Sequence, residues 1–135
     1  MFGRRLVRAL SRNHAETAFN DIDPRLRGRT YAIPFEQVWQ AARALADRGL
    51  RRWSLIDSDD YEGIIAAESR SLLGRSISDV SIRISLDHDA QTRVDMQARS
   101  RKGGVDMGAN ARRIGRFFRA LDQRVSQPGH AGAKR

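Results

Sequence analysis

Polar residues that could bind an anion gather in the last third of the chain. A glycine pair, Gly103 and Gly104, follows Arg101 and precedes an arginine-rich segment with helical periodicity. Free backbone N–H groups at a helix start favour a phosphate or carboxylate, and nearby arginines add charge-assisted hydrogen bonds. The sequence therefore predicts a candidate anion site made of Asp79, Arg99, Arg101, Gly103, Gly104, Asn110 and Arg113.

The same residues have a structural interpretation, in which the arginines form an internal salt-bridge network. Asp79 or Asp106 would then be the acceptor. The glycine pair adds little weight to the anion site, because it lacks the lysine spacing of a Walker-type phosphate loop.

Asn110 is an amide on an apolar helix face, three residues after Met107 and four before Ile114. A buried amide must find hydrogen-bond partners, since leaving it unsatisfied costs about 1–3 kcal/mol. We expect it to bond the backbone of residues 101–105 and to lock the sheet to the helix. In the alternative, Asn110 faces a ligand pocket.

No recognisable metal or catalytic motif accompanies this region. His14, His88 and His130 are far apart and lack metal-ligand spacing, and residues 57–60 do not follow the register of a calcium loop. The chain has no cysteine, which excludes thiol catalysis and cysteine-based metal sites. No nucleophile elbow or acid–base pair is recognisable. We therefore expect no metal and no cofactor, and a binding role rather than an enzyme.

The N-terminal segment combines apolar and basic residues at helical spacing. Such a helix could lie on an anionic bilayer, or it could be a disordered basic leader, or dock on its own domain. The candidate membrane-surface residues are Phe2, Arg5, Leu6, Arg8, Leu10 and Arg12.

The net charge of +9 is high for 135 residues. Residues 24–126 carry 19 basic and 13 acidic residues, so most of this charge belongs to the expected folded part. Such a charge points to an anionic partner, either an acidic protein or an anionic lipid, with nucleic acid as a less favoured choice. The alternative is that the arginines only solvate the surface.

Targeting signals are weak in this sequence. No segment approaches the roughly 20 apolar residues of a membrane span, and the N-terminus lacks the apolar stretch of a signal peptide. A cytoplasmic location is expected, with or without attachment to a membrane surface.

The elements that must position the candidate residues follow from periodicity. Residues 30–33 read as a strand, and Pro34 suits the first position of a helix over residues 35–46 that ends in a left-handed cap at Gly49. Alternation predicts strands over residues 53–56, 64–69, 80–86 and 93–99, with turns at residues 57–60 and 87–90. A second helix should run from residue 107 to 125, capped by Asp106.

This order predicts a small α+β, helix-grip-like domain, with an antiparallel sheet and both helices on one face. Residues 1–26 would be a basic leader and linker, residues 27–126 the single domain, and residues 127–135 a disordered tail. The other face of the sheet should be wet, because it would carry Ser81, Arg83, Ser85, Arg93, Asp95, Gln97 and Arg99.

Residues 27–122 resemble the bacterial and plastid family known as domain of unknown function 1499 (DUF1499), most strongly in the last third. The resemblance implies no activity, because the family has none established. The residues that carry it are Asp79-Val80, Arg93-Val94-Asp95, Ser100-Arg101, Gly103, Asp106, Gly108, Asn110-Ala111 and Arg113-Ile114, with the opening Arg29-Thr30-Tyr31.

We therefore expect a non-catalytic binding or accessory module of unknown pathway, with or without attachment to an anionic membrane surface. One alternative is an apolar-ligand carrier or enzyme with a helix–sheet cavity, which the bulky Trp39, Phe117 and Phe118 oppose by filling that space. The other is nucleic-acid binding, although the interleaved aromatics that stack on bases are missing. Its candidate residues are Arg83, Arg93 and Arg99 on the sheet, or Arg112, Arg116 and Arg119 on the last helix.

Overall fold

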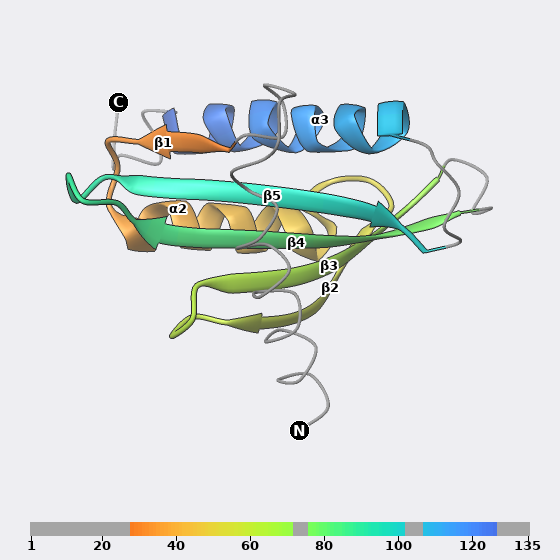
Figure 1. Ribbon diagram of the computed structural model, residues 1–135, viewed down its shortest axis with the longest axis horizontal. Coiled ribbons are helices and arrows are strands. Elements are labelled where there is room, and N and C mark those ends of the chain that lie inside the picture. Colours follow the sequence, from red (N-terminus) through yellow and green to blue (C-terminus); the bar gives the residue numbers. More distant parts are fainter. Residues whose placement is uncertain (1–27, 72–75, 102–106, 127–135) are drawn as a thin grey trace.

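The computed structural model describes residues 28–71, 76–101 and 107–126, which form an α+β domain (Figure 1). Five antiparallel strands make one sheet in the order β1-β5-β4-β3-β2, and two helices pack on one of its faces. The expected order of elements is confirmed. The elements are β1 (Arg29–Tyr31), α2 (Phe35–Ala44), the π-helical turn η2 (Leu45–Gly49), β2 (Trp53–Asp59), β3 (Ile64–Arg70), β4 (Ile77–Leu86), β5 (Thr92–Ser100) and α3 (Met107–Ser126).

The β4–β5 hairpin is the centre of the sheet and the source of much of the core. Its register pairs Ile82 with Met96 and Ile84 with Val94, so the apolar side chains of both strands point to the helices. Alternating apolar and polar residues make this pattern readable from sequence, because successive side chains of a strand point to opposite faces. Both strands extend beyond the predicted ends.

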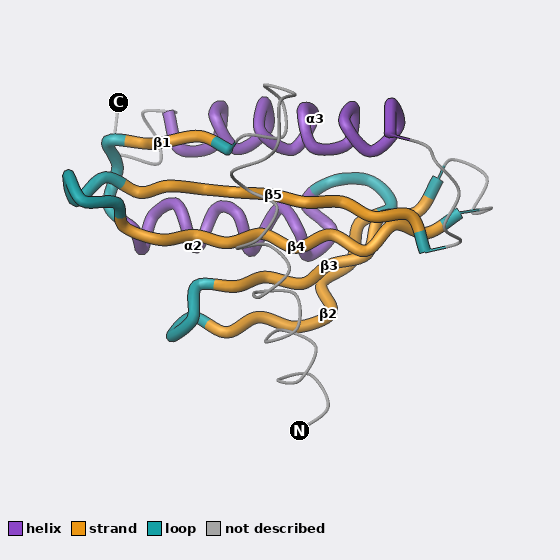
Figure 2. The backbone as a smooth tube through the Cα atoms, viewed as in Figure 1, coloured by secondary structure: helices purple, strands orange, loops and turns teal. Residues whose placement is uncertain are grey.

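Strand β2 runs through the acidic segment that the sequence predicts as a turn. The turn prediction for residues 57–60 is wrong, because backbone pairing with β3 continues to Asp59. The register shifts between Leu55 and Asp57, which leaves Ile56 bulged out. Asp59 then accepts hydrogen bonds from the N–H groups of Tyr61 and Glu62 and so forms the real turn. Pairing to a neighbouring strand has overridden the local turn propensity. Figure 2 shows this hairpin as two paired strands.

The end of the first helix differs from its prediction at Gly49. The left-handed residue is Arg48, with φ of 72°, and Gly49 itself has no positive φ. The chain closes a wider turn instead, in which the N–H of Leu50 donates to the carbonyl of Leu45 over 3.2 Å. Gly49 is needed for a different reason: a Cβ there would lie 2.6 Å from the carbonyl oxygen of Ala44. A glycine near a helix end thus serves close approach rather than φ.

The core lies between the two helices and the sheet. Phe117 stacks at a tilt on Trp53, with ring centroids 5.3 Å apart, and meets Phe118 edge to face. All three side chains are buried. The bulky residues therefore fill the interior, as the sequence predicts for Phe117 and Phe118.

The opposite face of the sheet, which we call the open face, is less wet than predicted. Ser81 and Asp95 are buried there, as are Ile64 and Ala66. The register places Ser81 between Ala66 and Gln97 on this face. Arg83, Ser85, Arg93, Gln97 and Arg99 keep partial or full exposure, as expected.

Several predictions fall on segments beyond the described ranges. These are the leader with its six candidate membrane-surface residues, the cap at Asp106, the glycine pair and the tail after residue 126.

Candidate functional site

The N-terminal half of α3 meets the sheet at a small polar junction. Ser78 of β4 and Ser100 of β5 are register partners whose side chains point to the helices. Asn110 and Arg113 reach them from α3. We call these four residues the polar junction.

The hydrogen bonds of the polar junction link all four side chains. Ser78 donates to Asn110 Oδ1 over 2.9 Å, and Asn110 Nδ2 donates to Ser100 Oγ over 3.2 Å. Arg113 Nη1 lies 2.9 Å from both Ser78 Oγ and Asn110 Oδ1 and donates to them. Ser78 is fully buried, so these bonds satisfy a hydroxyl that water does not reach.

Asn110 therefore ties the helix to the sheet through side chains. The partner predicted for it, the backbone after Arg101, lies almost wholly outside the described part of the chain. Its observed partners are two serine hydroxyls on neighbouring strands. Asn110 and Arg113 are both residues of the motif on which the family resemblance rests.

Arg101 lies on the open face and is held by two carboxylates. Its Nη2 is 2.6 Å from Asp79 Oδ1 and 2.6 Å from Glu68 Oε2, and its Nε donates to Asp79 Oδ2 over 3.3 Å. The hydrogen bonds that Arg101 donates to Asp79, and then those to Glu68, raise the pKa of Arg101 above its usual range. We call these three residues the acid–arginine cluster. It has the form of the internal salt-bridge network, with Glu68 as a partner that the sequence did not suggest.

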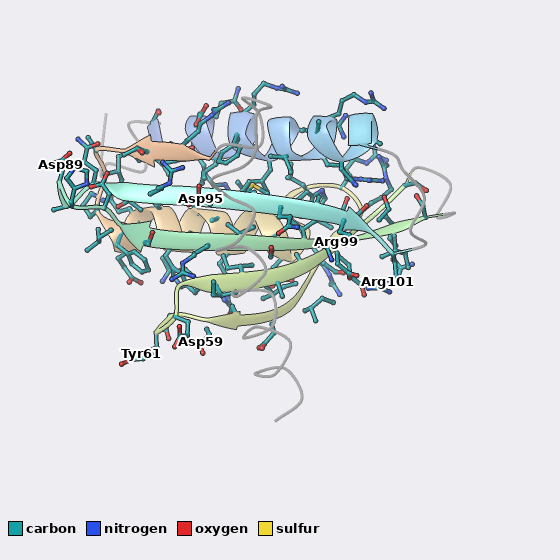
Figure 3. All side chains as sticks on the ribbon, in the orientation of Figure 1. Asp59, Tyr61, Asp89, Asp95, Arg99 and Arg101 are labelled. Carbon is teal, nitrogen blue, oxygen red and sulfur yellow. The ribbon has the colours of Figure 1, made fainter. Side chains whose placement is uncertain are left out.

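The residues of the predicted anion site divide between the two faces of the sheet. Asp79 and Arg99 are register partners on the open face, where Figure 3 shows Arg99 and Arg101 near one end of β5. Asn110 and Arg113 lie on the helix side with Ser78, the neighbour of Asp79 in the strand. Gly103 and Gly104 lie outside the described residues. Anion binding at this end of the sheet stays a prediction.

A third polar contact fastens the other half of α3 to strand β1. Asp122 accepts a hydrogen bond from the Tyr31 hydroxyl over 2.6 Å and forms an ion pair with Arg29. Arg29 also lies over the ring of Phe118, 4.9 Å from its centroid. Burial, and then the hydrogen bond to Asp122, raise the pKa of Tyr31 well above its usual range. Sequence reasoning missed this contact, because 91 residues separate Tyr31 from Asp122.

Charge is divided unequally between the two layers of the domain. Residues 35–52 and 107–126, which hold the helices, carry nine arginines and three acidic residues, a net charge of +6. The other described residues carry six arginines and nine acidic residues, a net charge of −3. The positive charge of the described domain therefore sits on its helical layer.

Three arginines form a stripe on the outward side of α3. Arg112, Arg116 and Arg119 are exposed, at a spacing that keeps them on one helix face. Among the described residues, no carboxylate pairs with any of them. We call this set the α3 arginine stripe.

The arginines of the open face have acidic neighbours instead. Arg93 forms an ion pair with Asp95, with Nη2 2.9 Å from Oδ1. Arg83 lies in register opposite the same aspartate. Their charge is locally compensated, so this face is a poorer attractor of anions than α3.

A groove of about 260 Å³ lies between α2 and the C-terminal end of α3. It is outside the helix–sheet core and is open to solvent. Its lining residues are Glu36, Gln37, Gln40, Ala41, Arg124 and Val125.

The described residues lack two features, a cluster of metal ligands and a helix that could span a membrane. Within these residues, no three histidine or acidic side chains come close enough to hold a metal ion. Neither described helix has the length and apolar character needed to cross a bilayer.

Comparison with known proteins gives a family and no activity. No curated protein matches this chain. The family described as protein of unknown function (DUF1499) matches residues 8–121. This range includes all four residues of the polar junction and the whole sheet. This match agrees with the resemblance seen in the motif around Asn110 and Arg113, and the chain belongs to the DUF1499 family.

Proposed function

We propose that this protein is a non-catalytic binding module that attaches to an anionic membrane surface through the α3 arginine stripe. The basic N-terminal residues 2–12 would provide a second contact. The cytoplasmic location expected from the sequence is part of the proposal.

The observation that carries the proposal is the separation of charge between the layers. The helical layer has a net charge of +6 and the rest of the described domain −3. Such a dipolar distribution orients a protein, so that the helices would face an anionic surface and the open face would point away.

The α3 arginine stripe suits a flat anionic surface better than a closed pocket. Arg112 and Arg119 are seven residues apart, which is about 10 Å along a helix. Each basic residue near an anionic bilayer contributes on the order of 1 kcal/mol. Three arginines would then change membrane partition by roughly two orders of magnitude.

The test is flotation of the full chain with vesicles of phosphatidylcholine, with and without phosphatidylserine. We expect binding only with phosphatidylserine, and weaker binding as salt increases. The triple variant Arg112→Gln, Arg116→Gln, Arg119→Gln should lose roughly 100-fold in partition. Equal flotation of the variant and the parent chain would reject the role of α3.

A matched control removes the same number of positive charges from the opposite face. The variant Arg70→Gln, Arg83→Gln, Arg99→Gln should float almost as well as the parent chain, because these residues lie on the sheet side. A separate deletion of residues 1–12 measures the contribution of the leader. If both triple variants lose binding equally, net charge and not the helix face controls attachment.

Nucleic-acid binding through the same stripe is the second candidate. It is favoured by the three exposed arginines on one helix face, since arginines in such an array can contact successive phosphates. Gel shifts with single- and double-stranded DNA and RNA over a range of salt test it. Binding that is tighter than to vesicles, and lost in the α3 triple variant, would replace the membrane proposal.

An apolar-ligand role has less support. The rings of Trp53, Phe117 and Phe118 occupy the space between helices and sheet where such a ligand would bind. A fluorescent fatty acid tests this role. If it binds without displacing these rings from their buried environment, its site is not the space between the helices and the sheet, and a ligand cavity in that space is rejected.

A further inference from the structure

The open face of the sheet contains a patch of buried side chains. No described helix lies over this patch. Ile64 is 1% exposed, Ala66 2% and Ser81 4%. Register places Ala66 beside Ser81, and Ile64 two residues away on the same face of β3. Both helices pack against the other face, through Ile65 and Ala67. These side chains are almost inaccessible to solvent, although neither described helix lies over this face, so another part of the chain is needed to cover them.

The chain enters the domain from this same face. Gly28 has a φ of 87°, and a Cβ on it would overlap the carboxylate of Asp95 and the carbonyl oxygen of Val94. The Asp95 side chain lies on the open face, so Gly28 lies on that side of β5. The residues immediately before Gly28 therefore start close to the patch.

The distance to the patch is short. Asp95 is in register with Arg83, and Arg83 with Ile64, so Ile64 is two strand spacings, or about 10 Å, from Asp95. Six residues span about 20 Å when extended and about 9 Å in a helix. The side chains of Phe19 and Ile22 can thus reach Ile64 and Ala66 in either conformation.

The family match includes the segment that precedes Gly28. It begins at residue 8, twenty residues before Gly28. A basic leader unrelated to the domain would not be expected inside the matched range. From these observations we propose that residues 13–27 pack across the open face, with Phe19 and Ile22 covering Ile64 and Ala66.

The negative charge of Asp95 on the open face complements the positive charges of Arg25 and Arg27. Asp95 Oδ1 is buried and pairs with Arg93, yet it accepts no well-aligned hydrogen bond from the described residues. Arg25 and Arg27 lie three residues and one residue before Gly28 in the sequence, so the proposed packing would bring guanidinium donors to that oxygen. The proposal concerns the face opposite the α3 arginine stripe and stands or fails independently of the membrane proposal.

The test uses the absence of cysteine, which makes any introduced thiol unique. Ala66→Cys reports on the open face and Ala67→Cys on the helix-covered face; both alanines are 2% exposed. In the otherwise unchanged chain, both thiols should react slowly with a maleimide. Adding Phe19→Asp and Ile22→Asp should speed labelling at position 66 by roughly tenfold or more and leave position 67 slow.

Three outcomes contradict the proposal: fast labelling of Ala66→Cys in the parent background, no acceleration by the leader substitutions, or equal acceleration at both positions. Phe2→Asp is the control for added negative charge outside the segment and should change neither rate. A second measurement does not depend on destabilising the segment. Oxidation of Ile22→Cys with Ala66→Cys should give an intramolecular disulfide, whereas Ile22→Cys with Ala67→Cys should not. Equal or absent cross-linking in the two pairs would overturn the proposal.

Discussion

The polar junction and the acid–arginine cluster lie at the same end of one sheet and differ in almost every physical respect. The junction lies under α3, where buried Ser78 shares hydrogen bonds with Asn110 and Arg113. The cluster lies on the opposite face, where Arg101 is 46% exposed at its side chain and is neutralised by two carboxylates. Adjacent residues, Ser78 and Asp79, belong to different clusters because a strand alternates its side chains.

This difference separates two roles for arginine in the chain. Arg113 is a structural donor in a half-buried network, and Arg101 is an exposed ion-pair partner. The α3 arginine stripe belongs to neither cluster. Its three exposed arginines have no carboxylate partner among the described residues and lie together on the outer face of the helix, which is why the proposed function assigns an anionic partner to them.

The largest effect on stability is expected from the polar junction. Asn110→Ala leaves Ser78 and Arg113 without their shared acceptor and should lower stability by about 1–3 kcal/mol. The melting temperature should fall by roughly 3–10 °C in a chain of this size. Alanine has the higher helix propensity, so helix preference would act in the opposite direction. Thermal unfolding followed by circular dichroism measures the fall in melting temperature. An unchanged melting curve would refute the structural role of Asn110.

A smaller effect is expected at the other end of α3, where Tyr31 meets Asp122. Tyr31→Phe removes one hydrogen bond and should cost about 1 kcal/mol at neutral pH. Because the folded pKa of Tyr31 is raised, the folded state holds its proton more tightly than the unfolded state does. That stabilisation is present below about pH 10 and is lost as pH rises above it.

Denaturant unfolding at several pH values checks this sign. The difference in stability between the parent chain and Tyr31→Phe should be constant below pH 9 or so and shrink above about pH 10. A difference that grows with pH in this range would show that the phenol is not the group held by Asp122.

The exposed cluster should matter less than the junction. Arg101→Ala should cost about 0.2–1 kcal/mol, because solvent screens an exposed pair. The cost should also shrink as salt increases, unlike that of Asn110→Ala. The two variants measured side by side in low and high salt test the comparison directly, and a salt-insensitive loss larger than that of Asn110→Ala would reverse it.

The smallest effect on stability is expected from the α3 arginine stripe. The triple glutamine variant of Arg112, Arg116 and Arg119 should stay within about 0.5 kcal/mol of the parent chain, since surface substitutions away from special features change little. Chemical denaturation checks this. A loss of several kcal/mol would mean that the stripe supports the fold, and any loss of vesicle binding in that variant would need another explanation.

Periodicity alone was sufficient to predict the elements whose apolar and polar residues alternate with one regular period. The alternation in β4 and β5 and the apolar stripe of α3 predicted two strands, their hairpin and a helix, since each pattern has one period over many residues. The boundary errors fall where local chemistry and tertiary pairing disagree. Residues 57–59 look like a turn and pair as a strand, and Gly49 looks like a cap and instead allows close approach to Ala44.

The amino-acid sequence by itself determined the α+β class, the order of the elements, the family and the need of Asn110 for hydrogen-bond partners between the last helix and the sheet. Only the tertiary structure decided that Arg101 and Arg113 face opposite sides of the sheet, that Glu68 joins Arg101, and that Tyr31 meets Asp122. The physical reason is that periodicity records which side of an element is buried. The identity of a partner dozens of residues away depends on strand register and helix placement, which appear only when the whole chain packs.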